Sequence, residues 1–316
     1  MCVVFAHACG LATSTPSSFE IIEERLCSII GTIGVPLFFF CSGFLLAKSK
    51  TPFKHILLKK LLTIIIPWVI SGTVVYLYVY LRKGPLNILT YLYFLIGNGS
   101  YLYFLPVYLV FIIIFSLLRK ISMFSKITIF VSSCFLCILF QTIYLYKGLN
   151  VFPISPYLNP LLYLPFFSFG FLFKGHWFQD LITSQKVIAL IASLSLTIVI
   201  LVFHILNVTN ITYFNILFIP FIFSMLPMFL FLVDLPFLFS KKSRFILYIG
   251  KKSFGIYLYH MPMAGIVSFL FNKLPFYHFA FFRPFLVVAI ATITIYFVNK
   301  FLKFIKAEKA SSFLGI

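Results

Sequence analysis

The apolar positions of this chain form long uninterrupted runs, without the alternation that marks membrane-spanning or half-buried strands. A helix needs about 20 apolar residues to cross the hydrocarbon core of a bilayer. Runs that approach or reach this length predict about ten transmembrane helices. The predicted spans are 1–12, 29–47, 61–81, 101–118, 127–146, 157–173, 187–206, 213–233, 253–271 and 284–305.

Two apolar stretches are too short for this rule. Residues 88–97 make about half a span, so a re-entrant or interfacial helix is expected there. Before Thr13 there are only about 12 apolar residues, roughly 18 Å of helix against a hydrocarbon thickness of about 30 Å. A signal peptide is not indicated, because a basic segment and a cleavage site are missing. We therefore expect that the first helix is truncated at its N-terminus, or that Met1 is not the natural start.

Composition supports a lipid environment. The chain is 62% hydrophobic and 10% charged, whereas soluble domains average about 45–50% apolar and about 25% charged residues. This excludes a soluble enzyme, a disordered chain and a secreted disulfide scaffold. We find no internal repeat, low-complexity linker or second domain in the sequence. Residues 1–316 are therefore predicted to form a single all-α polytopic membrane domain.

The charge distribution tests the span count. The net charge of +19 would suggest nucleic acid in a soluble protein, but in a membrane protein basic residues collect in cytoplasmic loops. With ten spans, nineteen basic residues fall on one side and six on the other. The six are Arg25, Arg82, Lys83, Lys147, Lys273 and Arg283. The asymmetry predicts that both termini are cytoplasmic, and no nucleic-acid partner is expected.

Ionisable side chains inside spans are the first candidates for chemistry, because burying them in a membrane is costly. His7 lies in the outer part of the first span and His260 lies in the ninth. An imidazole such as His7 can act as a general base toward a hydroxyl, or can simply hydrogen-bond a neighbouring helix. The residue type alone favours the second interpretation.

Other motifs give exclusions rather than sites. The sequence contains no Gly-x-Ser-x-Gly elbow, P-loop or dinucleotide fingerprint, which argues against common hydrolase, ATPase and dehydrogenase chemistry. The Cys134-x-x-Cys137 pair lacks a second pair or a nearby histidine, so no metal site is predicted and the cysteines are interpreted as packing residues. Glycines in the second and sixth spans, including Gly43 and Gly170, are expected to allow close helix packing.

The segment from Lys48 to Lys60 contains five lysines. Anchoring of the topology is sufficient to explain them. The alternative is a cradle for a phosphate-bearing cytosolic ligand, since ammonium groups bind phosphate as point charges. Lys59 and Lys60 adjoin the predicted membrane span and are best placed for that role.

Four segments together resemble the integral-membrane acyltransferase type 3 family, which includes polysaccharide O-acetyltransferases. They are residues 3–8 with His7, residues 34–46 (Gly-Val-Pro-Leu-Phe-Phe-Phe-Cys-Ser-Gly-Phe-Leu-Leu), residues 103–106 (Tyr-Phe-Leu-Pro) and residues 253–260 (Ser-Phe-Gly-Ile-Tyr-Leu-Tyr-His). In the third segment, Tyr103 stands where the family motif has Trp. The family's first-helix arginine would precede Met1, and Lys59 and Lys60 stand where arginines are usual. Lysine lacks the bidentate guanidinium contact.

The resemblance implies a bacterial cytoplasmic (inner) membrane enzyme. It would move an acyl group, most simply acetyl, from cytosolic acyl-CoA (acetyl-CoA) to a hydroxyl of a cell-surface saccharide or glycolipid. It implies that His7 is the essential base or acyl relay. Ser42, Tyr257 and His260 would line the cavity, and Lys59 and Lys60 would contact the CoA phosphates.

Two alternatives stay open at this point. One is a lipid-linked saccharide transporter or flippase, which would be indifferent to acyl-CoA. The other is an inactive family member that acts as a partner subunit. For the acyltransferase itself, the resemblance implies polysaccharide-biosynthesis proteins as partners.

Overall fold

The computed structural model describes residues 2–10, 17–80, 87–147, 155–174, 177, 180–181, 183–206, 212–234, 244–274, 277 and 279–316. Over these residues the chain is helical and contains no strand. Seven helices within the described part are long and apolar enough to cross a membrane. They are Ser18–Lys48, Phe53–Val79, Tyr101–Lys120, Met123–Tyr146, Thr183–Ile205, Leu247–Phe271 and Phe282–Phe304. The all-helical prediction is confirmed, and the count of ten spans stays a prediction.

The three other predicted spans form shorter helices. They are α1 (Cys2–Ala8), α8 (Leu164–Leu172) and α11 (Phe218–Asp234). Before α8 the predicted span 157–173 makes two 3-10 turns, η5 (Pro156–Leu158) and η6 (Pro160–Leu162). Proline has no backbone N–H to donate, so closely spaced prolines break a continuous α-helix into such short pieces. Hydropathy alone does not register this interruption.

Helix α2 (Ser18–Lys48) begins earlier than the predicted span 29–47. Its start is a capping box: the Ser17 amide donates to Glu20 Oε2 at 2.7 Å, and the Glu20 amide donates to Ser17 Oγ at 3.3 Å. The first turns of α2 carry acidic side chains, so the apolar run in the sequence begins later than the helix does. Helix α12 (Arg244–Phe271) similarly begins before the predicted span 253–271.

The basic segment from Lys48 to Lys60 is largely helical. Helix α3 (Phe53–Lys60) continues through a π-turn, η1 (Leu61–Ile65), into α4 (Ile66–Tyr80). The π-turn comes just before Pro67, whose missing N–H and ring disturb the preceding turn. The Thr63 hydroxyl donates to the Lys59 carbonyl at 2.8 Å, which satisfies one acceptor in this turn.

The half-span at 88–97 forms a short helix, as predicted. Helix α5 (Ile88–Ile96) has nine residues, is capped by the Asn87 side chain at Leu89 N (2.7 Å), and ends at Gly97 with φ 89°. Its length is about 14 Å at 1.5 Å per residue, which is too short to cross a bilayer. It packs against α4, where Trp68 Nε1 donates to the Leu95 carbonyl at 3.0 Å.

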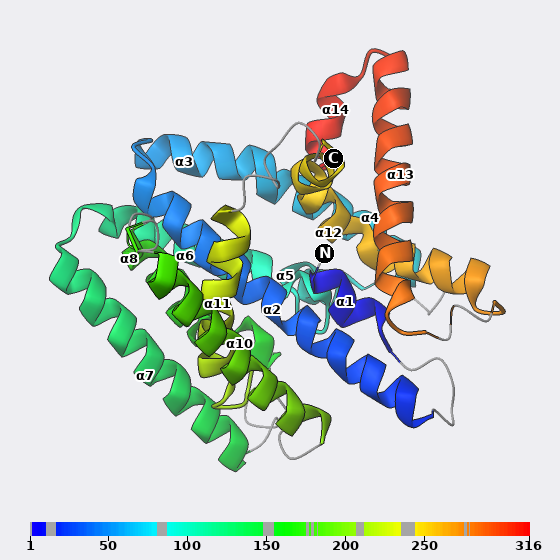
Figure 1. Cartoon of the computed structure of the whole chain (residues 1–316). Coiled ribbons are helices and arrows are strands. Elements are labelled where there is room, and N and C mark those ends of the chain that lie inside the picture. The colour runs from blue at the N-terminus through cyan, green and yellow to red at the C-terminus, as the bar shows by residue number, and fades with distance from the viewer. Residues whose placement is uncertain are drawn as a thin grey trace. The chain divides into compact units, whose positions relative to one another are not determined.

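The chain forms two compact units. The first contains Met1–Gly31, Lys50–Leu109 and Tyr248–Ile316, and the second contains Thr32–Ser49 and Val110–Leu247. In the first unit α1 packs beside α13 (Phe282–Phe304), and α14 (Glu308–Phe313) packs against α13 and α4 (Figure 1). This division does not test whether the chain is a single domain, which stays a prediction.

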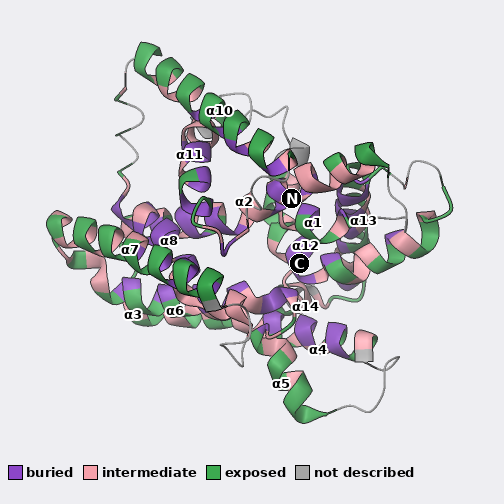
Figure 2. Cartoon of the chain, turned by 90° about the horizontal axis from the view of Figure 1, so that it is seen from below, coloured by how far each residue is buried: buried purple, intermediate pink, exposed green. Residues whose placement is uncertain are grey.

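In the second unit, α7 (Met123–Lys147) packs on α8, and α10 (Thr183–Ile205) packs on α11. Helix α8 is almost entirely buried, while one face of α7 and of α10 is exposed (Figure 2). The expected close helix packing occurs here. A Cβ atom at Gly43 would collide with the Phe167 backbone, and a Cβ atom at Gly170 would collide with the Phe40 backbone.

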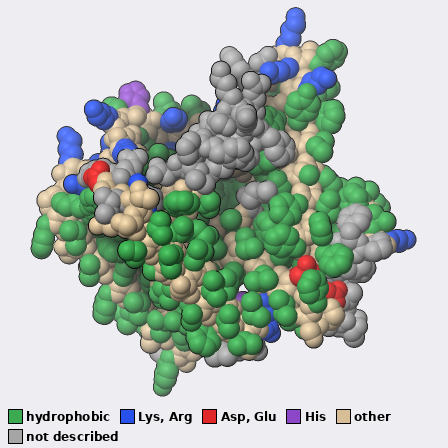
Figure 3. Space-filling model, in the orientation of Figure 1, with side chains coloured by type: hydrophobic (Ala, Val, Ile, Leu, Met, Phe, Trp, Pro, Cys, Tyr) green, Lys and Arg blue, Asp and Glu red, His purple; other side chains and the backbone are tan. Residues whose placement is uncertain are grey.

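The exposed surfaces of both units are strongly apolar. In α7 the Phe135 side chain is 65% exposed, and in α13 the Phe304 side chain is 84% exposed. Hydrophobic side chains cover much of the face shown in Figure 3. Patches of this kind are rare on soluble monomers and are stable in contact with lipid tails. Together with the long apolar helices, they indicate a multi-pass membrane protein.

Candidate functional site

His7 is presented by the short helix α1. Seven residues are too few for a stable isolated helix, so packing must hold α1 in place. Val4 is buried against α12 and α13, and Phe5 is buried with Cys9, Cys27 and Ala280. His7 is exposed on the remaining face of the helix. The apolar face of α1 therefore fixes where the imidazole lies.

His260 lies beside His7, with ring centroids 5.2 Å apart. It is completely buried in α12, and its Nδ1 lies 2.6 Å from the Tyr257 carbonyl oxygen. A carbonyl oxygen only accepts, so Nδ1 carries a proton. In the neutral ring Nε2 is then a lone-pair acceptor. Within the described part of the chain Nε2 has no hydrogen-bond partner. A buried acceptor thus stands next to the His7 ring.

Two buried tyrosines hold His260 in position next to His7. The Tyr101 hydroxyl donates to the Leu258 carbonyl at 2.7 Å, and the Tyr257 hydroxyl donates to the Tyr101 carbonyl at 2.5 Å. The Tyr101 ring centroid lies 4.9 Å from that of His260 and 6.5 Å from that of His7. Both tyrosines are buried. Their reciprocal bonds join η2 (Tyr101–Tyr103) to α12 and hold His260 in place.

Sequence reasoning did not single out Tyr101. It did identify residues 103–106 as a motif, which pointed to the correct segment. The ring that reaches the histidines belongs to the residue two positions before Tyr103, and only the 3-10 turn at η2 decides that.

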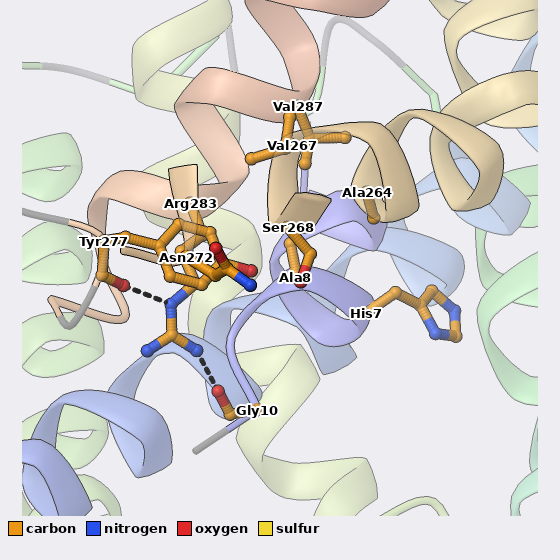
Figure 4. Close-up of a pocket in the computed structure, with 10 residues that line it drawn as sticks. All are labelled: His7, Ala8, Gly10, Ala264, Val267, Ser268, Asn272, Tyr277, Arg283 and Val287. Atoms are coloured by element: carbon orange, nitrogen blue, oxygen red, sulfur yellow. Dashed lines mark hydrogen bonds between the residues drawn. The ribbon is translucent and has the colours of Figure 1, made fainter. Parts of the chain in front are cut away.

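A pocket of about 450 Å³ opens beside His7. Figure 4 shows its lining, with His7 on one side and Tyr277, Asn272 and Arg283 on the other. The remaining lining residues are Ala8, Gly10, Ala264, Val267, Ser268 and Val287. All belong to the first unit. The pocket therefore combines an imidazole, a guanidinium, neutral hydrogen-bonding groups and small apolar side chains.

Arg283 closes one wall of the pocket and is itself buried. Its Nε donates to the Tyr277 carbonyl at 2.7 Å, and its Nη1 donates to the Gly10 carbonyl (Figure 4). The guanidinium also lies over the Tyr277 ring, 4.9 Å from the centroid. These contacts tie the chain just after α1 to the start of α13. Sequence reasoning counted Arg283 only as one of six outer charges.

The other predicted site residues are not all brought to this pocket. Lys59 is exposed in the last turn of α3, and Lys60 places its ammonium 5.1 Å from the ring centroid of Tyr108. Both lysines belong to the first unit, as do His7, Tyr257 and His260. Ser42 belongs to the second unit, next to Gly43 where α2 meets α8. Its proposed role in the cavity stays a prediction.

Groups that could hold a metal ion are not found in the described part of the chain. Cys137 is buried and its thiol lies 3.9 Å from the Leu162 carbonyl, which is the packing role expected of it.

A protein-family model described as an acyltransferase domain matches residues 1–298. The chain belongs to this family, acyltransferase type 3. The match spans α1 to most of α13 and includes every residue of the pocket. The comparisons with curated proteins and with solved structures gave no match.

Membership of the acyltransferase type 3 family supports an acyltransferase-type activity. An acyltransferase needs a general base or an acyl relay for the attacking hydroxyl, and a site from which water is excluded. The His7–His260 pair lies beside a pocket and against buried aromatic rings, so this site is the best candidate in the described part of the chain.

Proposed function

We propose that this protein transfers an acyl group, most simply acetyl, from cytosolic acyl-CoA to a hydroxyl of a cell-surface saccharide or glycolipid. The observation that carries the proposal is the His7–His260 pair beside the pocket, in a chain that belongs to an acyltransferase family. We place the protein in the bacterial cytoplasmic membrane, with both termini in the cytoplasm as the charge asymmetry predicts.

In this proposal His7 is the general base. It removes the proton of the acceptor hydroxyl as the oxygen attacks the thioester carbonyl. The tetrahedral intermediate then expels the CoA thiolate, which takes up the proton, so that an ester and free CoA thiol result. The Nε2 lone pair of His260 accepts a hydrogen bond from the proton that His7 carries, directly or through a water molecule. Such a partner stabilises an imidazolium and orients its ring.

The proposed orientation gives donor and acceptor separate approaches. In the predicted topology α3 lies at the cytoplasmic side, and the ends of α1 and α12 that line the pocket lie at the outer side. Acyl-CoA would then approach past Lys59 and Lys60, while the acceptor would enter the pocket from outside. His7 would meet both substrates.

The direct test uses membranes that contain the protein, supplied with labelled acetyl-CoA. We expect label in an alkali-labile ester on extracted glycolipid or polysaccharide, and none in matched membranes that lack the protein. Transport of a lipid-linked saccharide without any acetyl-CoA-dependent label would contradict the proposal and favour the transporter alternative.

The lysines of α3 give a prediction about the donor. Lys59 is exposed and has no side-chain partner in the described part of the chain, so its ammonium is available to a CoA phosphate. A hydrogen bond to a charged group contributes about 1.5–3 kcal/mol. We expect Lys59→Met to raise KM for acetyl-CoA about tenfold and to leave KM for the acceptor unchanged.

Lys54→Met is the matched control, since Lys54 is also exposed on α3 but lies near its first turn. Lys59→Arg should retain or improve donor binding, because a guanidinium makes bidentate phosphate contacts. An unchanged KM for acetyl-CoA in Lys59→Met would remove Lys59 from the donor site.

A further inference from the structure

The pocket beside His7 has a recognisable pattern along α12. His260, Ala264, Ser268 and Asn272 are spaced four residues apart, so they follow one row along the helix. The Asn272 backbone N–H donates to the Ser268 carbonyl at 3.0 Å, so the helical hydrogen-bond pattern continues as far as Asn272. The row begins at His260, which is buried and does not itself line the pocket. Ala264, whose small side chain leaves space, follows it, and the neutral polar side chains of Ser268 and Asn272 come next.

The polar groups of this row are unused. Within the described part of the chain, neither the hydroxyl of Ser268 nor the side-chain carboxamide of Asn272 makes a hydrogen bond. Both side chains line the pocket. A hydroxyl and a carboxamide can each donate and accept. A ligand with several hydroxyl groups offers the same two functions. It therefore matches these side chains without requiring a charge.

The other side chains that line the pocket favour an uncharged ring. The Tyr277 aromatic ring and the Arg283 guanidinium both line the pocket. Arg283 already donates to the carbonyls of Gly10 and Tyr277 and lies over the Tyr277 ring, so its charge serves the protein's own backbone. What the pocket offers beyond that is an aromatic ring and the small apolar side chains of Ala264, Val267 and Val287, against which the C–H face of a sugar ring can pack.

From this arrangement we propose that the pocket is the acceptor subsite and takes a neutral pyranose. Ser268 and Asn272 bind ring hydroxyls, Tyr277 packs against the ring, and one further hydroxyl is directed at His7. The assignment rests on the proposed function, because it identifies the class of acceptor for the same reaction. The pocket volume of about 450 Å³ leaves room for one sugar ring with part of its neighbour.

The test measures transfer of labelled acetyl-CoA to increasing amounts of the glycolipid fraction extracted from native membranes. We expect Ser268→Ala and Asn272→Leu each to raise KM for this fraction about tenfold, and KM for acetyl-CoA to stay the same. Asn272→Asp keeps the acceptor oxygens but loses the amide donors, and should fall between wild type and Asn272→Leu.

Matched controls exist next to each position. Lys273 and Phe269 are exposed neighbours that do not line the pocket, so Lys273→Met and Phe269→Ala should leave both KM values unchanged. Wild-type KM values in Ser268→Ala and Asn272→Leu would overturn the acceptor assignment while the proposed function stands. A rise in KM for acetyl-CoA instead would identify a donor site and would also overturn it. Absence of acetyl-CoA-dependent label in the wild type is a failure of the proposed function itself.

Discussion

Replacement of His7 by alanine is expected to reduce acyl transfer by about 10³-fold, because a positioned general base contributes typically 10²–10⁴-fold. Membrane insertion should not change, since the anchoring side chains of α1 are Val4 and Phe5 and His7 is on the exposed face. The measurement is acetyl-CoA-dependent label in glycolipid ester at equal amounts of protein in the membrane. His7→Gln should be equally inactive, because a carboxamide has hydrogen-bonding groups but cannot take up a proton near neutral pH.

His55→Ala is the matched control, since His55 is exposed on α3 in a segment distant in sequence from the pocket residues. Its activity should equal that of the wild type. Full transfer by His7→Gln would show that His7 positions the substrate without moving a proton. Full transfer by His7→Ala would remove the proposed site altogether.

The second large effect concerns the fold. Gly170→Val is expected to destabilise the second unit by roughly 3 kcal/mol or more, at the upper end of overpacking substitutions. The added side chain would meet the backbone of Phe40, which cannot move aside as a flexible side chain can. Gly43 faces the Phe167 backbone in the same way, so the two glycines together allow α2 and α8 to approach closely. The measurement is the temperature at which detergent-solubilised protein leaves the monodisperse peak.

Gly250→Val is the appropriate comparison, because a Cβ atom at Gly250 in α12 has nothing within 4 Å. That variant also places a β-branched residue in a helix, so it separates helix propensity from the collision. A transition temperature for Gly170→Val equal to that of Gly250→Val would contradict the close approach of α2 and α8.

The prediction of helices from apolar runs succeeded where lipid contact dominates. Long helices such as α7 and α13 are apolar over most of their length, because lipid and protein both exclude charge. The prediction was less accurate at helix ends. The start of α2 carries acidic residues and a capping box, and α3 carries lysines, so helices there extend beyond the apolar segments. Prolines shortened the helix at α8 without changing its hydropathy.

The candidate site was predicted in part. His7, Tyr257 and His260 were selected from residue type and motif, and the structure places them in one cluster. Tyr101 and Arg283 were missed, because their contacts join segments more than 150 residues apart. No local pattern in the sequence reports such a contact.

The sequence by itself determined the solvent and the chemistry available to this protein. Its apolar runs require lipid, its scarce ionisable residues limit the candidate bases, and its motifs agree with the family that covers residues 1–298. The tertiary structure decided which of those groups meet. Packing between distant helices buries Nε2 of His260 and brings Tyr101 and Tyr257 into hydrogen-bond contact. The same packing forms the pocket that Ser268, Asn272 and Arg283 line. Periodicity and composition describe each helix alone, whereas the site exists only where helices touch.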